Sequence, residues 1–261
     1  MKYSFIGCGN IGSAVARGLI SKGIFAAADV TCCDIIESSL EQMRKHCPGI
    51  KTTTDSREAV TGADCIVVAV KPWAVEQTLG AFKDMLDLDR QNLIVIAAGI
   101  TFGMMSEWLG ADATMFRVIP NTAIAVGSSM TFVSAQNASP ERTAAVVEMF
   151  DALGSAMLIP EDKMSAGTAL ASCGIAYAMR YVRAATEGGV ELGFPAKDAR
   201  NIVLNTVKGA VDLLLATGAN PEEEIDKVTT PGGITIKGLT KMEEEGFTNA
   251  VIAGLKASQS K

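Results

Sequence analysis

Residues 7–12 read Gly-Cys-Gly-Asn-Ile-Gly, and this glycine loop constrains the fold more than any other part of the chain. It follows an apolar run, Tyr3 to Ile6, that is typical of a short buried strand, and a helical pattern begins within it. A G-x-G-x-x-G loop in that context predicts the first strand, turn and helix of a dinucleotide-binding βαβ unit. Gly7 would permit the tight turn, Gly9 would bare the backbone for a pyrophosphate, and Gly12 would let helix and strand pack closely. A glycine turn that binds nothing is the alternative.

Short apolar runs alternate with helical patterns over residues 1–160, which is typical of a doubly wound parallel sheet. The runs at Ile66–Val68 and Ile94–Ile96 are apolar throughout, as expected of central strands with helices on both faces. We therefore predict an α/β fold with an N-terminal Rossmann-type domain over residues 1–160. Asp55 and Glu58 have the spacing of a capping box at a helix start. The expected strands are Lys2 to Ile6, Asp29 to Cys33, Asp64 to Val70, Asn92 to Ala97, Ala113 to Ile119, Ser128 to Val133 and Ala156 to Ile159.

After Pro160 the strand pattern stops, and every later segment shows helical spacing. The first two of these helices carry apolar residues on two sides, and such helices need partners on both sides. Residues 161–261 alone are too few to cover these faces, so we predict an all-helical C-terminal domain that dimerises. Its helices are expected from Met164, over Pro195 to Thr217, from Asn220-Pro221 and after the break at Pro231-Gly232-Gly233.

The charge balance and the cysteine pattern argue against several classes of function. With 23 Lys and Arg against 29 Asp and Glu, the net charge of −6 is opposite to that expected of a nucleic-acid-binding protein. Six cysteines without a C-x-x-C pair and a single histidine, His46, offer little to ligate a metal. The longest apolar runs fall short of the roughly 20 residues that a membrane span needs, and no signal peptide precedes the first strand. We expect a cytoplasmic protein with reduced thiols and with no metal, membrane or nucleic-acid partner.

An acidic residue, Asp34, lies at the end of the second expected strand, directly after Cys33 and 22 residues after Gly12. At this place in a Rossmann unit a carboxylate typically accepts hydrogen bonds from the adenosine ribose, and it would repel a 2′-phosphate. Ile35 and Ile36 follow it, where an arginine would favour the phosphate. We therefore expect NADH to be favoured over NADPH. The alternative is that Asp34 only caps the next helix.

Four further motifs, together with the glycine loop, give the chain a resemblance to a known family. They are Ala69-Val70-Lys71-Pro72, Ala97-Ala98-Gly99-Ile100, Arg117-Val118-Ile119-Pro120-Asn121-Thr122 and Val228-Thr229-Thr230-Pro231-Gly232-Gly233-Ile234-Thr235-Ile236. Over its whole length the chain resembles the pyrroline-5-carboxylate reductases, and the last motif is the most specific. The resemblance implies reduction of 1-pyrroline-5-carboxylate to L-proline by NAD(P)H, the last step of proline biosynthesis. It also implies a homodimer, with further assembly to a decamer left open.

The resemblance implies roles for particular residues. The turn formed by Thr230, Gly232, Gly233 and Ile234 is expected to seat the substrate carboxylate on bare N–H groups at a helix start. Thr235, the expected catalytic residue, would hydrogen-bond the ring nitrogen or relay a proton, because its hydroxyl is too weak an acid to donate alone. An ordinary cap hydroxyl is the alternative. The cofactor is expected to contact Ile6, Gly7, Cys8, Gly9, Asn10, Ile11, Gly12, Asp34, Ser56, Ala69, Val70, Lys71 and Pro72.

The long helix after residue 160 departs from the family pattern. It reads Ser172-Cys173-Gly174-Ile175-Ala176-Tyr177, where the family usually has Gly-Ser-Gly-Pro-Ala-Tyr, so Tyr177 is expected to pack rather than to bind substrate. Ser56 stands where the family often has an asparagine, and Ala123 where it has a proline. The same helix lacks the lysine of the related β-hydroxyacid dehydrogenases. Another imine or 3-hydroxyacid reductase of this architecture, or a non-catalytic dinucleotide sensor, remains the alternative.

Overall fold

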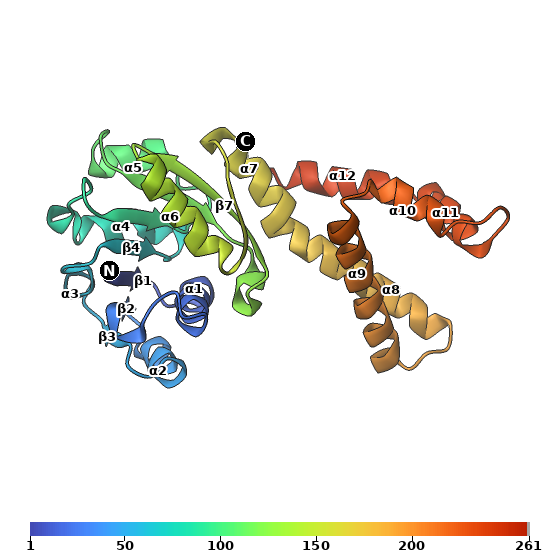
Figure 1. The fold of residues 1–261 in the computed structure, drawn as a ribbon, viewed down its shortest axis with the longest axis horizontal. Helices are drawn as coiled ribbons and strands as arrows, with labels where there is room; N and C mark the ends of the chain where they lie inside the picture. Colours follow the sequence, from blue (N-terminus) through green and yellow to red (C-terminus); the bar gives the residue numbers. More distant parts are fainter. Residues whose placement is uncertain (260–261) are drawn as a thin grey trace. The chain divides into compact units, whose positions relative to one another are not determined.

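The computed structural model describes residues 1–259, which form two compact units that divide after Ser172 (Figure 1). The last two residues of the predicted helical domain, 161–261, lie outside the described part. The first residues of that predicted domain belong to the first unit, because Met164 packs with Ile119 and Phe132 in a small apolar cluster. Contacts thus place the division after residue 172, whereas the change from strands to helices falls near residue 160.

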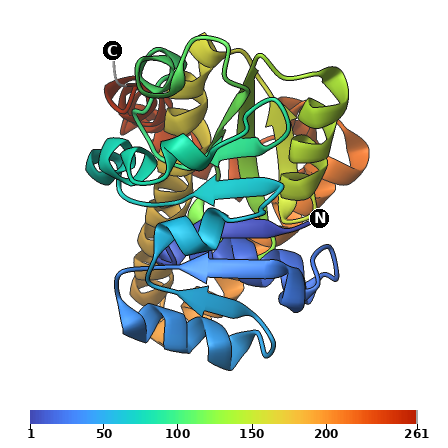
Figure 2. The ribbon, with the colours of Figure 1, turned by 90° about the vertical axis from the view of Figure 1, so that its left-hand side faces the viewer.

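The first unit is built on an eight-stranded sheet with the order β3-β2-β1-β4-β5-β6-β7-β8 (Figure 2). Neighbouring strands are parallel except for β6 and β7, which are antiparallel. The first six strands have the Rossmann order, so the predicted α/β fold is confirmed. The strands are β1 (Tyr3–Ile6), β2 (Val30–Cys33), β3 (Lys51–Thr53), β4 (Cys65–Val68), β5 (Asn92–Val95), β6 (Met115–Ile119), β7 (Ser129–Gln136) and β8 (Gly154–Leu158).

Helices cover both faces of this sheet, and strand residues alternate between the two resulting cores. Phe5 and Val67 point into one core, while Ile6 and Val68 point into the other. Fully burying a side chain as large as Phe5 contributes about 1.5–3 kcal/mol of transfer free energy. The first core is covered by α1 (Asn10–Ser21), α2 (Glu37–His46) and α6 (Pro140–Asp151), and the second by α3 (Ser56–Val60), α4 (Val75–Gly80) and α5 (Phe102–Leu109).

The start of α3 differs from the predicted capping box. Asp55 caps the helix as expected, because its Oδ1 accepts from the N–H of Arg57 at 2.9 Å. Glu58, however, accepts from the hydroxyl of Thr53 at 2.5 Å instead of reaching back to Asp55. Thr53 ends β3, a short polar edge strand that the apolar pattern did not predict. The unpredicted strand brings the competing hydroxyl within reach of Glu58.

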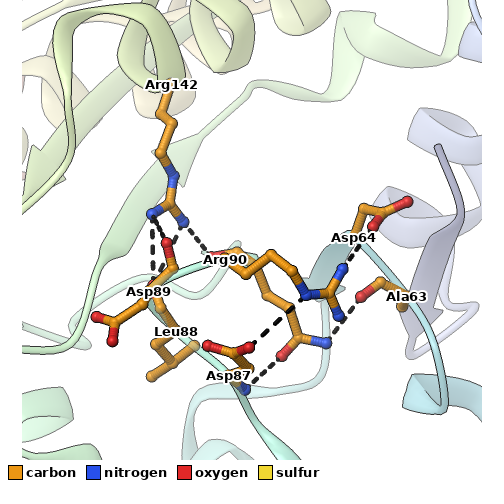
Figure 3. Close-up of polar contacts among 8 residues, drawn as sticks. Ala63, Asp64, Asp87, Leu88, Asp89, Arg90 and Arg142 are labelled. Atoms are coloured by element: carbon orange, nitrogen blue, oxygen red, sulfur yellow. Dashed lines mark hydrogen bonds and ion pairs between the residues drawn. The ribbon is translucent and has the colours of Figure 1, made fainter.

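Arg142 of α6 ties the helix to the turn before β5 (Figure 3) and, through the hydroxyl of Thr114 at 3.3 Å, to the residue before β6. Its Nε donates to Asn92 Oδ1 at 2.7 Å, one terminal nitrogen donates to the carbonyl of Asp89 at 3.0 Å, and the other to the carbonyl of Gln91. Partial burial lowers the pKa of this guanidinium. Side-chain hydrogen bonds thus hold the amino ends of these strands, and the glycine loop lies at the opposite, carboxyl ends of the parallel strands.

The second unit is helical, as predicted. Its helices are α8 (Gly174–Glu191), α9 (Ala196–Thr217), α10 (Pro221–Lys227), α11 (Ile234–Glu244) and α12 (Phe247–Ala257). The chain leading to α8 forms α7 (Met164–Gly167) and then a π-helical segment, Thr168–Cys173, whose last residue is the first residue of the second unit. Inside the second unit, the Tyr177 hydroxyl donates to the carbonyl of Gly254 at 3.3 Å and bonds Ser258, which joins α8 to α12.

Among residues 1–259, no single helix is long and apolar enough to cross a membrane. Only α9 and α10 taken together reach that length and composition, and the chain bends by 116° between them.

Candidate active site

The glycine loop has the geometry that a bound dinucleotide requires. Gly7 has a φ of +98°, and a Cβ there would lie 2.8 Å from the carbonyl oxygen of Ala69, beyond the end of β4. A Cβ on Gly12 would lie 2.0 Å from the carbonyl oxygen of Gly7, so only glycine allows helix and loop to pack this closely. A Cβ on Gly9 would instead project into open space, with no atom within 4 Å. The loop is therefore packed tightly against the segment after β4 at Gly7 and Gly12, while its backbone at Gly9 is open on the side where a pyrophosphate would lie.

The N-terminus of α1 adds backbone N–H groups to the glycine loop, and together they can bind an anion. Gly9 is the N-cap residue, and no side chain within residues 1–259 caps the helix there. The first four N–H groups of a helix lack acceptors in the helix itself, and they carry the positive end of its dipole. The residues present thus fit a dinucleotide pyrophosphate at Gly9, Asn10 and Ile11.

Asp34 follows β2 at the same edge of the sheet and is held on both carboxylate oxygens. Its Oδ2 accepts from the N–H of Cys8 at 2.6 Å, and its Oδ1 accepts from the N–H of Ile36 at 2.9 Å. The bond to Ile36 lies just ahead of α2, which agrees with a local capping role. The bond to Cys8, however, crosses to the glycine loop and fixes the carboxylate beside it. Because each carboxylate oxygen has further lone pairs, Asp34 can still accept from a ribose hydroxyl.

The segment after β4 lies along the carboxyl edge of the sheet, where open α/β sheets bind ligands. Ala69 and Val70 are half-buried, and Lys71 is exposed and precedes a 3₁₀ turn, Pro72–Ala74. Trp73, in this turn, is 82% exposed, and no sequence pattern predicted an exposed indole there. Ser56 is the first residue of α3 and is half-buried.

The thiols around the loop are structural. Cys8 Sγ donates to the carbonyl of Cys33 at 3.6 Å. A hydrogen bond with Cys8, followed by burial, raises the pKa of the Cys32 thiol, and burial raises the pKa of Cys33 to about 12. A thiol with a raised pKa is protonated near neutral pH and is a poor nucleophile. Cys32 and Cys33 are therefore not candidates for thiol chemistry.

In the second unit, the predicted substrate turn opens α11. Gly232 has a φ of +70°, and the N–H of Gly233 donates to the carbonyl of Thr230 at 2.9 Å. A Cβ on Gly233 would lie 2.4 Å from the Thr230 hydroxyl, so the turn requires glycine there. Ile234, the first helical residue, is 88% exposed, and Thr235 follows on the first turn, also exposed. The turn therefore presents bare backbone and a hydroxyl at a helix N-terminus, which suits a carboxylate.

Sequence reasoning missed one polar group, an ion pair near the carboxyl end of β5. Arg117, in the middle of β6, forms an ion pair of 2.5 Å with Glu161, and both side chains come from segments far apart in the chain. Arg117 lay within a family motif, but no local spacing indicated its partner.

Comparison with known proteins agrees with this geometry. The family profile described as "Pyrroline-5-carboxylate reductase dimerisation" matches residues 161–261, and one described as "NADP oxidoreductase coenzyme F420-dependent" matches residues 2–99. The pyrroline-5-carboxylate reductase of Methanosarcina acetivorans is 34% identical over 99% of this chain and 97% of its own length. Pyrroline-5-carboxylate reductase 1 of Dictyostelium discoideum is 34% identical over 98% of this chain, which spans 48% of that relative's length.

A solved structure is similar as well. The crystal structure of Plasmodium falciparum pyrroline carboxylate reductase with NADP bound matches with a TM-score of 0.89 at 27% identity, covering 99% of this chain and 95% of that one. The sheet order and the glycine loop define a Rossmann-type oxidoreductase that uses NAD(P). With a relative 34% identical over nearly all of both chains, the narrower assignment follows. The chain belongs to the pyrroline-5-carboxylate reductase family.

Proposed function

We propose that this chain reduces 1-pyrroline-5-carboxylate to L-proline with NAD(P)H, the last step of proline biosynthesis. The observation that carries the proposal is the turn from Thr230 to Gly233 at the N-terminus of α11, which adds a carboxylate seat to a dinucleotide-binding protein. A dinucleotide sensor would need the glycine loop but would have no need of this turn. Membership of the family supports the same substrate.

The chain's residues have modest chemical tasks in this reaction. The bound dinucleotide supplies the hydride, and a protonated cyclic imine is already a strong electrophile, so the protein mainly has to orient the two and exclude water. The N-terminus of α1 binds the pyrophosphate, and Asp34 accepts from the adenosine ribose. The N–H groups at Gly232 and Gly233 hold the substrate carboxylate. Thr235 positions the ring nitrogen through its hydroxyl and relays to it, from water, the proton that converts the neutral imine to the iminium before hydride transfer; hydride addition then gives the neutral amine.

For the cofactor, we propose that NADH is used in preference to NADPH. The carboxylate of Asp34 is fixed beside the glycine loop by two backbone N–H groups, and Ile35 and Ile36 next to it offer no positive charge. A 2′-phosphate would be repelled by this carboxylate, and the nearby guanidinium of Arg44 is already paired with Glu37 at 2.6 Å.

For the assembly, we propose a homodimer in which residues 161–261 of two chains interlock, with dimers associating further to a decamer. The match to a dimerisation family supports this, as do large exposed apolar side chains on the helical unit. Each active site would combine one chain's residues 1–160 with helices of the other. A stable and active monomer in sedimentation at micromolar concentration would contradict it. We place the enzyme in the cytoplasm, without a nucleic-acid or membrane partner, in keeping with its net charge of −6.

The test of the activity follows dinucleotide absorbance with 1-pyrroline-5-carboxylate, and then with 3-hydroxyacids and with cyclic imines that lack a carboxylate. Turnover is expected with the first compound, and the imines without a carboxylate should show a much higher KM. Preferred turnover of a 3-hydroxyacid would overturn the proposal.

A further inference from the structure

Arg117 is a charged residue in a row of β6 that is otherwise apolar. Only 7% of its surface is exposed, and its neighbours on the same side of the strand, Met115 and Ile119, belong to apolar clusters. A buried guanidinium costs free energy unless it is paired. Its environment therefore needs an explanation.

Three segments meet at this guanidinium. Arg117 donates to Glu161 Oε1 at 2.5 Å, and the N–H of Phe102 donates to the same carboxylate oxygen at 2.7 Å. The guanidinium carbon also lies 5.9 Å from the centre of the Phe102 ring. Phe102 is the first residue of α5, and Glu161 begins the short turn that leads into α7. The carboxylate thus joins β6, the start of α5 and the segment before α7.

The meeting point lies at the nicotinamide side of the sheet. Arg117 is in register with Val95, the last residue of β5, and the turn between Val95 and Phe102 leaves the carboxyl edge. Asp34 marks the adenosine end at β2, on one side of β1, while β5 and β6 lie on the other side. A dinucleotide whose pyrophosphate lies at the β1 loop therefore extends its other half toward β4, β5 and β6.

The side chain of Arg117 is 8% exposed and that of Glu161 is 36% exposed, so the ion pair is buried on its arginine side. Replacing a buried ion pair by apolar residues of similar volume is often neutral or stabilising, so stability alone does not account for the pair. Hydrogen bonds are directional, whereas apolar packing is not. The bonds from Arg117 and the Phe102 N–H to Glu161 therefore fix the position of the turn before α5 relative to β6.

We propose that Arg117 and Glu161 are positioning residues for the reaction, which hold the turn between β5 and α5 as the wall for the nicotinamide end of the dinucleotide. The inference rests on the proposed function for its substrate, but not for its dinucleotide. Neither residue is proposed to contact the reacting atoms. They act through the Phe102 N–H and the turn that precedes it.

The test uses the double variant Arg117→Met with Glu161→Met, which leaves no unpaired charge, and measures binding of NADH and of ADP-ribose to the full-length protein without substrate. ADP-ribose contains the adenosine and pyrophosphate parts of NADH but lacks the nicotinamide. We expect its affinity to be unchanged while that of NADH falls several-fold, and kcat with 1-pyrroline-5-carboxylate to fall by about tenfold to a hundredfold. Glu161→Gln, which keeps an acceptor for both donors, should retain most of the NADH affinity.

The matched control is Arg142→Met, because Arg142 bonds Asn92 at the amino end of β5; its contacts with the turn before β5 are drawn in Figure 3. Arg142 also ties elements to the sheet, so its loss should lower the melting temperature while the ratio of NADH to ADP-ribose affinity stays at the wild-type value. Equal weakening of both ligands in the double variant, or no change in either, would overturn the inference. Wild-type protein that fails to reduce 1-pyrroline-5-carboxylate would overturn the proposed function instead, because the binding measurements need no substrate.

Discussion

The preference for NADH can be tested at one side chain, Asp34, with the variant Asp34→Ser. The carboxylate is held in place by the N–H groups of Cys8 and Ile36, at 2.6 and 2.9 Å, so it cannot swing away from an incoming phosphate without breaking both bonds. At about 5 Å in water, a phosphate of about two negative charges is repelled by a carboxylate by roughly 1.5 kcal/mol. A repulsion of this size corresponds to a preference of roughly tenfold for NADH.

The serine variant removes this repulsion, and it also removes part of the hydrogen bonding between residue 34 and the N–H groups of Cys8 and Ile36. Serine has one uncharged side-chain oxygen in place of the two carboxylate oxygens that hold Cys8 and Ile36, so the charge-assisted bonds to the loop are lost and the KM for NADH should rise. The preference should narrow mainly through a lower KM for NADPH, since the chemistry at the nicotinamide is unchanged. Asp34→Asn is the matched control for charge, because it keeps the shape and one acceptor oxygen while removing the negative charge.

The assay compares kcat/KM for NADH and NADPH in wild type and both variants, at low and at physiological ionic strength. The wild-type preference should increase as salt is removed, because salt screens exposed charges, and the salt effect should vanish in the variants. A higher wild-type kcat/KM with NADPH at physiological ionic strength would refute the reasoning. Ser38 or a lysine of α2 would then have to bind the phosphate.

Three further predictions concern single side chains. Thr235→Ala should lower kcat by about tenfold to a hundredfold, the equivalent of roughly 1–3 kcal/mol, with NADH binding unchanged in a direct titration; an unchanged kcat would make Thr235 a simple cap residue. Ser4 is fully buried on β1, and its hydroxyl has no partner among the described residues, so Ser4→Ala should raise the free energy of unfolding by about 1 kcal/mol in urea titrations. The Lys2 N–H, and then Arg90, hold the pKa of Asp64 below its usual value, so the folded protein favours the carboxylate. This contribution to stability is present above the usual carboxyl pKa and is lost as the pH falls through the folded-state pKa, so Asp64→Asn should be less stable at neutral pH and lose less stability on acidification.

Local sequence determined much of the first unit because its signals act over short distances. The glycine loop, the continuous apolar runs of β4 and β5, and the Asp55 cap all depend on residues within one turn or strand, and the structure contains each of them. In the same way, Pro221 and the break before α11 marked helix starts in the second unit. β3 was not predicted, because an edge strand of three polar residues buries too little side chain to produce an apolar pattern in the sequence.

Only the tertiary structure decided which distant side chains meet. Asp34 was expected at the end of β2, but its bond to the Cys8 N–H depends on the parallel pairing of β1 with β2. Arg117 and Glu161 are 44 residues apart, and nothing in the spacing of either residue indicates the other. A hydrogen bond requires its donor and acceptor to lie within a few tenths of an ångström of the right distance, whereas an apolar pattern requires only that a residue face inward. For that reason the sequence could predict the strands and the loop, while the partners of charged side chains emerged only from the packed sheet.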